Sequence, residues 1–365
     1  MKVRNTRSIT VAGIALLSTA LAFMPAAVQA DLDFSGKKIT LIVPFKEGGG
    51  VDQYARFFQP FFEKHLPGKP AILVVNKPGG ASVRAGNWFE REAKPDGLTV
   101  FMAGNSTMTN AAVGGKKVKF NMLKWRPIIA TPSGTCFYAK KETGITGKNP
   151  AEDIKKLQSG KWVVATQKPV SASVRYFMAL EMLGVKNLTY LYGLGSGPRR
   201  KAFQRNEVTV SIDTAAPCLQ KVRQFEKRGQ AVMFMALGYR KSDGTMGRDP
   251  AFPELYTVAE AYQATYGKPP SGQIWQALKH FINFTVMTSY GMFLPKGTND
   301  DIVNTYVTAM KKILADPAFK KKSAKLIGNY PQVLGHEATV LLKDALDITP
   351  DTRKWLNNWF QKISK

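Results

Sequence analysis

A short glycine-rich segment near the start of the chain constrains its fold more than any other feature. The apolar, β-branched run 38–43 predicts a buried strand, the three glycines at 48–50 predict a tight loop, and Asp52 opens an amphipathic stretch. A strand that leads through such a loop into a helix points free backbone N–H groups at the space beyond the strand. The segment therefore predicts an anion site in an α/β fold.

The same alternation of strands and helices continues along most of the chain. Further apolar runs predict strands at 71–75, 98–102, 127–130, 136–139, 162–165, 188–192, 208–212 and 232–237. Strands that alternate with helices predict a mostly parallel sheet, and ligands of such sheets bind beyond the carboxyl ends of the strands. The glycine-rich turns after several of these strands are therefore expected to converge on one site.

Residues 1–30 have the pattern of a secretory signal peptide. Basic residues precede an apolar run at 9–23, and small residues end at Ala30, after which cleavage is predicted. An uncleaved membrane anchor is the alternative, although the run is short for spanning a bilayer. The mature chain is expected in the periplasm, as a soluble monomer with no inserted segment.

The formal net charge of +26 suits anionic partners such as small acids. Nucleic acid is not expected as a partner, because no basic groove interleaved with aromatic residues and no known binding motif can be recognised. The lysine clusters at 116–117 and 320–322 are predicted to be solvated surface.

Motifs of nucleotide-binding, hydrolytic and metal-dependent enzymes do not occur in the sequence. No Gly-Lys-Ser/Thr follows the triple glycine, and the glycines do not have the spacing of a dinucleotide fingerprint. There is no Gly-x-Ser-x-Gly, and the three histidines lack the spacing of metal ligands. We therefore predict no cofactor, no metal and no catalytic residue, although a single general base is not excluded by the pattern.

The chain contains two cysteines, Cys136 and Cys218, and each lies close to a predicted strand of the middle segment. An exported protein meets an oxidising compartment, where disulfides persist. A disulfide between them and a pair of free thiols remain alternatives at this point.

Six motifs occur in a recognisable order. Ile-Val-Pro-Phe at 42–45 is followed by Gly-Gly-Val-Asp at 49–52, Val-Asn-Lys-Pro-Gly-Gly at 75–80 and Ala-Lys-Pro-Asp-Gly-Leu-Thr at 93–99. Gly-Ser-Gly-Pro at 195–198 and Leu-Pro-Lys-Gly-Thr at 294–298 come later. In this order the motifs resemble the signatures of the solute-binding proteins of tripartite tricarboxylate transporters, the Bug or TctC-like family.

The resemblance implies a periplasmic binding protein of the Venus flytrap kind, type II-like, with two lobes and a hinge. Residues 31–130 and 251–365 would form lobe 1, and residues 131–250 would form lobe 2. Such a protein is not an enzyme: it captures a small aliphatic or aromatic carboxylate and delivers it to a membrane permease. The rival hypotheses are an exported α/β enzyme acting on small acids and a ligand-sensing subunit for a membrane kinase.

The resemblance also implies that the first two glycine turns hold a carboxylate through backbone amides, while the opposite lobe supplies hydroxyl groups. Asp52 is expected to cap its helix rather than touch the ligand. The predicted ligand-binding residues are Phe45, Lys46, Gly48, Gly49, Gly50, Gly79, Gly80, Ala81, Ser82, Asn105, Ser106, Thr166, Ser171, Ser173, Arg175, Gly195, Ser196, Gly197 and Asp213.

Several residues depart from the family pattern. Glu47 would repel a carboxylate unless it faces solvent, and Arg199 and Arg200 replace small residues. Arg175 stands where a histidine region is common, and the segment 266–290 is expanded. We hypothesise that Arg175 pairs with a second charged or polar group of the ligand, since guanidinium suits bidentate recognition. The alternative is an arginine on a helix surface.

Overall fold

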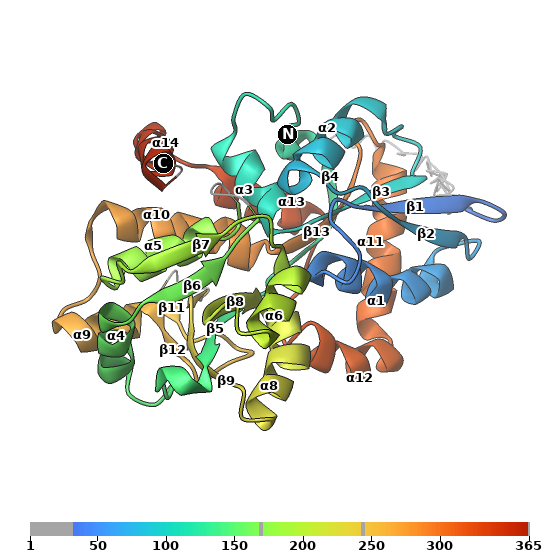
Figure 1. Ribbon diagram of the computed structural model, residues 1–365. Helices are drawn as coiled ribbons and strands as arrows, with labels where there is room; N and C mark the ends of the chain where they lie inside the picture. Colours follow the sequence, from blue (N-terminus) through green and yellow to red (C-terminus); the bar gives the residue numbers. More distant parts are fainter. Residues whose placement is uncertain (1–31, 168–170, 242–244, 364–365) are drawn as a thin grey trace, which may run out of the picture. The chain divides into compact units, whose positions relative to one another are not determined.

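Two main sheets organise the chain in the computed structural model (Figure 1), which describes residues 32–167, 171–241 and 245–363. The predicted signal peptide lies outside these residues. Within the described ranges, no helix has both the length and the apolar composition needed to cross a membrane.

The first sheet has six strands in the order β14-β4-β13-β3-β1-β2. These strands are β1 (Lys38–Val43), β2 (Ala71–Asn76), β3 (Thr99–Ala103), β4 (Arg126–Thr131), β13 (Tyr290–Leu294) and β14 (Val333–Leu334). β1 pairs in parallel with β2 and β3, so that Ile42 lies between Val75 and Phe101. β13 runs antiparallel to both β3 and β4.

The second sheet has the order β12-β9-β5-β8, and a parallel pair, β6 and β7, accompanies it. The strands are β5 (Thr135–Lys140), β6 (Trp162–Ala165), β7 (Leu188–Leu191), β8 (Val210–Thr214), β9 (Ala231–Ala236) and β12 (Tyr256–Thr257). β10 (Tyr239–Arg240) and β11 (Met246–Gly247) form a short antiparallel pair. β12 lies beyond residue 250, the predicted end of lobe 2, yet it pairs with β9.

The prediction of a mostly parallel sheet is wrong, because both sheets are mixed. β5 is antiparallel to β8 and β9, and β4 and β13 are antiparallel neighbours. β4 leads directly into β5, and the chain returns to the first sheet through β13. Strands that pass between sheets without a helical crossover are free to pair antiparallel, whereas a βαβ unit forces parallel pairing.

Helices cover both sheets, and Figure 1 shows α1 beside α11 next to β1 and β2. The α-helices are α1 (Gly50–His65), α2 (Val83–Glu92), α3 (Asn105–Val113), α4 (Pro150–Ser159), α5 (Val174–Met182), α6 (Ser196–Gln204), α7 (Ala215–Pro217), α8 (Arg223–Lys227), α9 (Val258–Tyr266), α10 (Gly272–Ile282), α11 (Asp300–Ala315), α12 (Pro317–Leu326), α13 (Gly335–Leu346) and α14 (Pro350–Ile363). Short 3₁₀ turns occur at η1 (Gly80–Ser82), η2 (Met122–Lys124) and η3 (Lys141–Thr143), and π-helical turns at η4 (Cys218–Val222) and η5 (Asn283–Met287).

An aromatic cluster fixes the position of α1. Phe58 is fully buried, and its ring lies 5.1 Å from that of Phe319 in α12. Phe62 contacts the ring of Tyr306 in α11 at 6.1 Å. Burying each such ring contributes about 1.5–3 kcal/mol. The predicted helical aromatic stripe is thus core packing, and it holds the second half of α1 against α11 and α12.

The segment that joins β4 to β5 packs against a buried carboxyl group. A methyl group on Gly134 would lie 1.3 Å from Oδ2 of Asp249, so only glycine fits. Oδ1 of Asp249 accepts hydrogen bonds from the Tyr330 hydroxyl at 2.5 Å and the Ala251 N–H at 2.9 Å. Burial raises the pKa of Asp249 to about 6.

A disulfide joins Cys136 of β5 to Cys218 at the start of η4. Because β5 and β8 are neighbours and η4 follows β8 closely, the sheet itself brings the two cysteines together.

Candidate functional site

A cavity of about 120 Å³ lies where residues from the two sheets meet. From the side of the first sheet it is lined by Phe45, Gly49, Gly50, Val51, Asn105, Ser106 and Tyr290. From the side of the second sheet it is lined by Gln167, Ser171, Ala172, Ser173, Arg175, Tyr176, Ser196, Arg199, Asp213 and Thr214. Pockets for drug-sized ligands measure roughly 300–1,000 Å³, so this cavity suits a small solute.

The amino ends of four helices meet at this cavity. Gly50 begins α1, Asn105 begins α3, Ser173 precedes α5 and Ser196 begins α6. The first N–H groups of a helix have no acceptor within the helix, and the helix dipole places positive charge there. No side chain caps α1, α5 or α6. The cavity therefore presents backbone donors and a positive potential to a bound anion.

Hydrogen bonds to the side chain of Asp52 hold the first glycine loop in place. The Asp52 carboxylate accepts hydrogen bonds from the Gly48 N–H at 2.9 Å, from Nδ2 of Asn76 at 2.9 Å and from Nε of Arg56 at 3.0 Å. Burial opposes the charge of Asp52, but these bonds hold its pKa below the ordinary value. The prediction that Asp52 caps α1 is wrong, because its side chain turns back to the loop and leaves the helix end uncapped.

Arg175 is almost completely buried, at 1% exposed, so the alternative of a surface arginine is wrong. Nη1 donates to the Thr285 carbonyl at 2.8 Å, and Nη2 donates to the Tyr176 hydroxyl at 2.8 Å. When the Asn105 amide is oriented to satisfy its neighbours, its oxygen accepts from Nη2 of Arg175 at 2.9 Å. The partners of this cation among the described residues are thus neutral groups.

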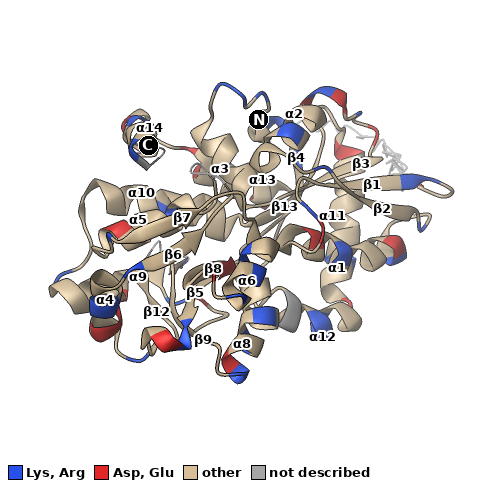
Figure 2. Cartoon of the chain, viewed as in Figure 1, with Lys and Arg blue, Asp and Glu red and all other residues tan. Residues whose placement is uncertain are grey.

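A second cationic cluster lies on the same side of the cavity as Arg175. Arg199 and Arg200 of α6 both donate to Oδ1 of Asp213 in β8, at 3.2 and 3.0 Å, and Figure 2 shows the basic segments of α6 beside an acidic segment of β8. The Tyr138 hydroxyl donates to Oδ2 of Asp213 at 3.0 Å. Burial opposes the charge of Arg199, but the Asp213 carboxylate raises its pKa, so it stays charged.

The second glycine loop borders a neighbouring cavity of about 230 Å³, which shares Phe45, Gly49 and Gln167 with the first. Its residues 79–82 all have positive φ, including Ala81 and Ser82, which lack the freedom of glycine. Nδ2 of Asn110 donates to the Ala81 carbonyl at 2.7 Å and supports this backbone. Such strained backbone is concentrated at ligand sites in other proteins.

Most predicted site residues lie at these two cavities. The 120 Å³ cavity is lined by Phe45, Gly49, Gly50, Asn105, Ser106, Ser171, Ser173, Arg175, Ser196 and Asp213, and the neighbouring cavity by Lys46, Gly79, Gly80, Ala81, Gly195 and Gly197. Gly48, Ser82 and Thr166 line neither. The N–H of Gly48 donates a hydrogen bond to Asp52, and the hydroxyl groups of Thr166 and Ser171 are hydrogen-bonded at 3.1 Å. Gly48 and Thr166 therefore stabilise the loops that border the cavity rather than line it.

Sequence reasoning missed Val51, Gln167, Ala172, Tyr176, Arg199, Thr214 and Tyr290 as lining residues. The sequence did mark Arg199, because it departs from the family pattern at a position where small residues are usual. Nothing in the sequence marked Tyr290 as a lining residue, because its strand lies at the end of the expanded segment 266–290 and reaches the first sheet only through the fold. The Glu47 side chain is 78% exposed and lies 3.7 Å from Arg56, and it lines the neighbouring cavity of about 230 Å³.

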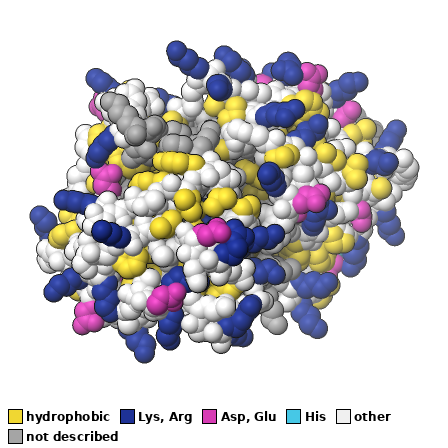
Figure 3. Space-filling model, viewed as in Figure 1, with side chains coloured by type: hydrophobic (Ala, Val, Ile, Leu, Met, Phe, Trp, Pro, Cys, Tyr) yellow, Lys and Arg dark blue, Asp and Glu magenta, His cyan; other side chains and the backbone are white. Residues whose placement is uncertain are grey.

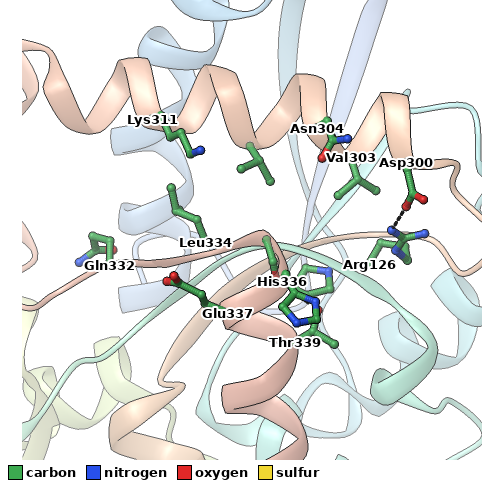
Figure 4. Close-up of a pocket in the computed structure, with 13 residues that line it drawn as sticks. Arg126, Asp300, Val303, Asn304, Lys311, Gln332, Leu334, His336, Glu337 and Thr339 are labelled. Atoms are coloured by element: carbon green, nitrogen blue, oxygen red, sulfur yellow. Dashed lines mark hydrogen bonds and ion pairs between the residues drawn. The ribbon is translucent and has the colours of Figure 1, made fainter. Parts of the chain in front are cut away.

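A larger cavity of about 510 Å³ lies between α11 and the β14–α13 segment (Figure 4). Arg126 and Asp300, which form an ion pair, lie at one end, and Lys311, His336 and Glu337 line the remainder. Gly335, the first residue of α13, also lines it, and none of the predicted site residues does.

Basic side chains are spread over the visible face of the molecule rather than gathered in one place (Figure 3). Lys116, Lys117 and Lys320 to Lys322 are exposed, as the sequence predicted.

Comparison with known proteins gives relatives over most of the chain. No family model matches. A UPF0065 protein of Bordetella pertussis is 26% identical over 308 residues, which cover 82% of this chain and 83% of the relative. A UPF0065 protein encoded in the tcbD–tcbE intergenic region of Pseudomonas sp. strain P51 is 24% identical over 336 residues, 88% of each chain.

Several solved structures share the fold of this chain. The periplasmic binding protein BugD matches 88% of this chain and 97% of its own, with a TM-score of 0.66 and 21% identity. The chain has the fold of the TctC and Bug solute-binding proteins. Another structural neighbour, a Rhodopseudomonas palustris protein solved with adipate, has a TM-score of 0.67 at 17% identity over 91% of this chain and 98% of its own. MatC of the same species, solved with malate, has a TM-score of 0.62 at 19% identity over 90% and 99%.

The resemblance to TctC and Bug proteins that the motifs predicted is therefore confirmed, and the mixed α/β fold matches solved structures of periplasmic binding proteins.

Proposed function

We propose that this protein is an exported solute-binding protein that captures a small carboxylate and delivers it to a membrane permease of the tripartite tricarboxylate type. In this proposal residues 1–30 are a cleaved signal peptide, the mature chain is a periplasmic monomer, and the ligand is aliphatic or aromatic. The two lobes close around the ligand by a hinge at the segment between β4 and β5 and at the return to β13.

One observation carries the proposal: the uncapped amino ends of α1, α5 and α6 and that of α3 point to one small cavity that also contains buried arginine side chains. A carboxylate placed there accepts charge-assisted hydrogen bonds from the amides of the Gly49–Val51 turn. The second glycine loop, at Gly79 to Ala81, closes the neighbouring part of the cleft. The serines at 171, 173 and 196 offer hydroxyl donors from the opposite wall.

The structural neighbours support a carboxylate as the ligand class. MatC was solved with malate and the Rhodopseudomonas palustris protein with adipate. Both ligands are small dicarboxylates.

A thermal-shift screen of the purified mature chain tests the proposal. The panel contains aliphatic and aromatic mono-, di- and tricarboxylates, with their amides and methyl esters as uncharged controls. A ligand present at a hundred times its Kd stabilises the folded state by about 2.7 kcal/mol, which is a clear rise in melting temperature. Stabilisation by a carboxylate, but not by its amide, supports the proposal; a panel without any stabilising acid contradicts it.

The same samples distinguish a receptor from an enzyme. A binding protein leaves the stabilising acid unchanged after long incubation, whereas an exported enzyme converts it, and chromatography of the recovered ligand separates these outcomes. Uptake of the identified acid by cells that lack the gene then separates transport from sensing. A transport protein is required for uptake, while a sensing subunit is required only for the response to the acid.

A further inference from the structure

The C-terminal helix α14 bridges two helices that both begin at the cavity. α3 begins at Asn105 in the predicted lobe 1, and α5 follows Ser173 in the predicted lobe 2. α14 packs against α3 and α10, and α10 packs against α5 (Figure 1). The last helix of the described chain therefore contacts elements of both predicted lobes.

The first part of α14 is anchored to the carboxyl end of α3. Nη1 of Arg353 donates to the Ala112 carbonyl at 2.6 Å and to the Val113 carbonyl at 3.4 Å. The last carbonyl groups of a helix have no donor within the helix, and the helix dipole favours a cation there. Arg353 therefore binds α14 to the end of α3 that lies farthest from the cavity along the helix.

The last part of α14 is anchored to α5. The carboxylate of Glu181, near the carboxyl end of α5, accepts from Nε1 of Trp359 at 2.8 Å and from Nζ of Lys362 at 3.0 Å. The two bonds use different oxygens of the carboxylate. Glu181 thus connects α14 to α5 in the same way that Arg353 connects it to α3.

Apolar side chains of α14 between these anchors are buried. Leu356 is fully buried, and Trp359 and Phe360 are nearly so. All three belong to one hydrophobic cluster that also contains Val113 of α3 and Leu180 of α5. Burial of apolar surface holds α14 against the protein, whereas the polar anchors fix which residues of α3 and α5 it joins.

α3 and α5 are also joined at their other ends, since the oriented Asn105 amide accepts from Arg175 beside the cavity. We propose that α14 is a strap that holds the two lobes together on the solute, with Arg353 and Glu181 as its anchoring residues. This inference rests on the proposed function, in which the lobes close around the solute. It adds the element that sets how fast the solute is released.

The release rate of a bound acid tests the strap. The probe is the acid among malate, adipate and benzoate that binds the purified mature chain most tightly, and stopped-flow tryptophan fluorescence measures its association and release. Glu181→Gln and Arg353→Gln each weaken one anchor. Each is expected to speed release about 3- to 10-fold and to change the association rate less than about twofold.

The double variant Glu181→Gln/Arg353→Gln distinguishes a strap from two unrelated contacts. A strap that is free at one end no longer holds the lobes, so loss of the second anchor adds little. The double variant is expected to release the acid at most about twofold faster than the faster single variant, whereas independent contacts would multiply their effects.

The chain offers a closely matched control in Glu90. Its carboxylate accepts from Nε1 of Trp125 at 2.7 Å and from Nζ of Lys296 at 2.8 Å, which repeats the bonds of Glu181 with the same residue types. These three residues all lie within the predicted lobe 1. Glu90→Gln is therefore expected to leave the release rate of the acid unchanged.

The possible outcomes are distinct. Faster release in both single variants, little further change in the double variant and no change in Glu90→Gln support the inference. Effects that multiply, or release from Glu181→Gln at the wild-type rate, overturn it and leave the proposed function standing. Failure of these acids and of the thermal-shift panel to bind overturns the proposed function instead. Small-angle X-ray scattering without ligand then tests the strap: a larger radius of gyration in the double variant than in the wild type supports it, and an equal radius overturns it.

Discussion

The hydroxyl groups of Tyr290 and Thr214 lie 2.9 Å apart and share a hydrogen bond, although Tyr290 belongs to β13 of the first sheet and Thr214 to β8 of the second. Both residues line the 120 Å³ cavity. Burial raises the pKa of Tyr290 to about 12, so its hydroxyl remains protonated at physiological pH. The contact thus connects the two walls of the site at the cavity itself.

Tyr290→Phe removes this hydrogen bond and keeps the ring. We expect ligand affinity to fall about three- to tenfold, because a neutral hydrogen bond contributes about 0.5–1.5 kcal/mol. Isothermal titration measures the change. Tyr306→Phe is the control, since the buried Tyr306 hydroxyl bonds the Gly97 carbonyl at 2.6 Å away from the cavity; a similar loss of affinity in both variants would refute a specific role for Tyr290.

Gly50→Ala is expected to weaken binding about 5- to 100-fold. Its added methyl group would lie 3.0 Å from the Tyr290 hydroxyl and 3.4 Å from Oγ1 of Thr214, and overpacking of this kind costs about 1–3 kcal/mol. Gly197→Ala, at the neighbouring cavity, is the comparison for overpacking alone, because a methyl group there meets no atom within 4 Å. Titration of both variants with the same acid checks the prediction, which is wrong if Gly50→Ala binds as tightly as the wild type.

The protein should lose stability as the pH rises through about 6. The pKa of Asp249 is about 6 in the folded protein and about 3.8 in an exposed carboxyl group, so the folded state holds a proton that the unfolded state releases between these values. This contribution is complete below pH 3.8 and is lost above pH 6, and it amounts to about 3 kcal/mol.

Asp249→Asn isolates the effect, since the amide keeps the shape without a titrating proton. The difference in free energy of unfolding between the variant and the wild type should grow in favour of the variant from pH 4 to pH 7. Urea titrations at these pH values measure it. A difference that does not vary with pH would contradict the raised pKa of Asp249.

Reduction of the disulfide between Cys136 and Cys218 should destabilise the protein. The bridge spans 82 residues, and in the chain-entropy model a loop of this size contributes about 4 kcal/mol. Urea unfolding with and without dithiothreitol measures the effect. The double variant Cys136→Ser/Cys218→Ser should be insensitive to reductant, and an equal shift in that variant would show that the reductant acts elsewhere.

The elements near the first glycine loop were predictable because local patterns encode them. The run 38–43 is β1 as predicted, and the aromatic repeat from Tyr54 to Phe62 is the buried face of α1. Gly49 and Gly50 reach the cavity because the loop follows directly from that strand and helix. These inferences require only residues close together in the sequence.

The other features of the site depend on contacts between residues that are distant in the sequence. The burial of Arg175 is set by Thr285 and Asn105, which lie on other elements. Tyr290 reaches the site only because β13 inserts between β3 and β4, an antiparallel arrangement that no local pattern signals. Asp213 was predicted as a ligand contact, and its bonds to two arginines of α6 could not be inferred without the fold.

A crystal structure of the mature chain with its best-binding acid tests the central claim most directly. The account predicts one carboxylate within hydrogen-bond distance of the backbone amides of the Gly49–Val51 turn. A ligand bound in the cavity between α11 and α13, or one that leaves these amides without an anion, would contradict it.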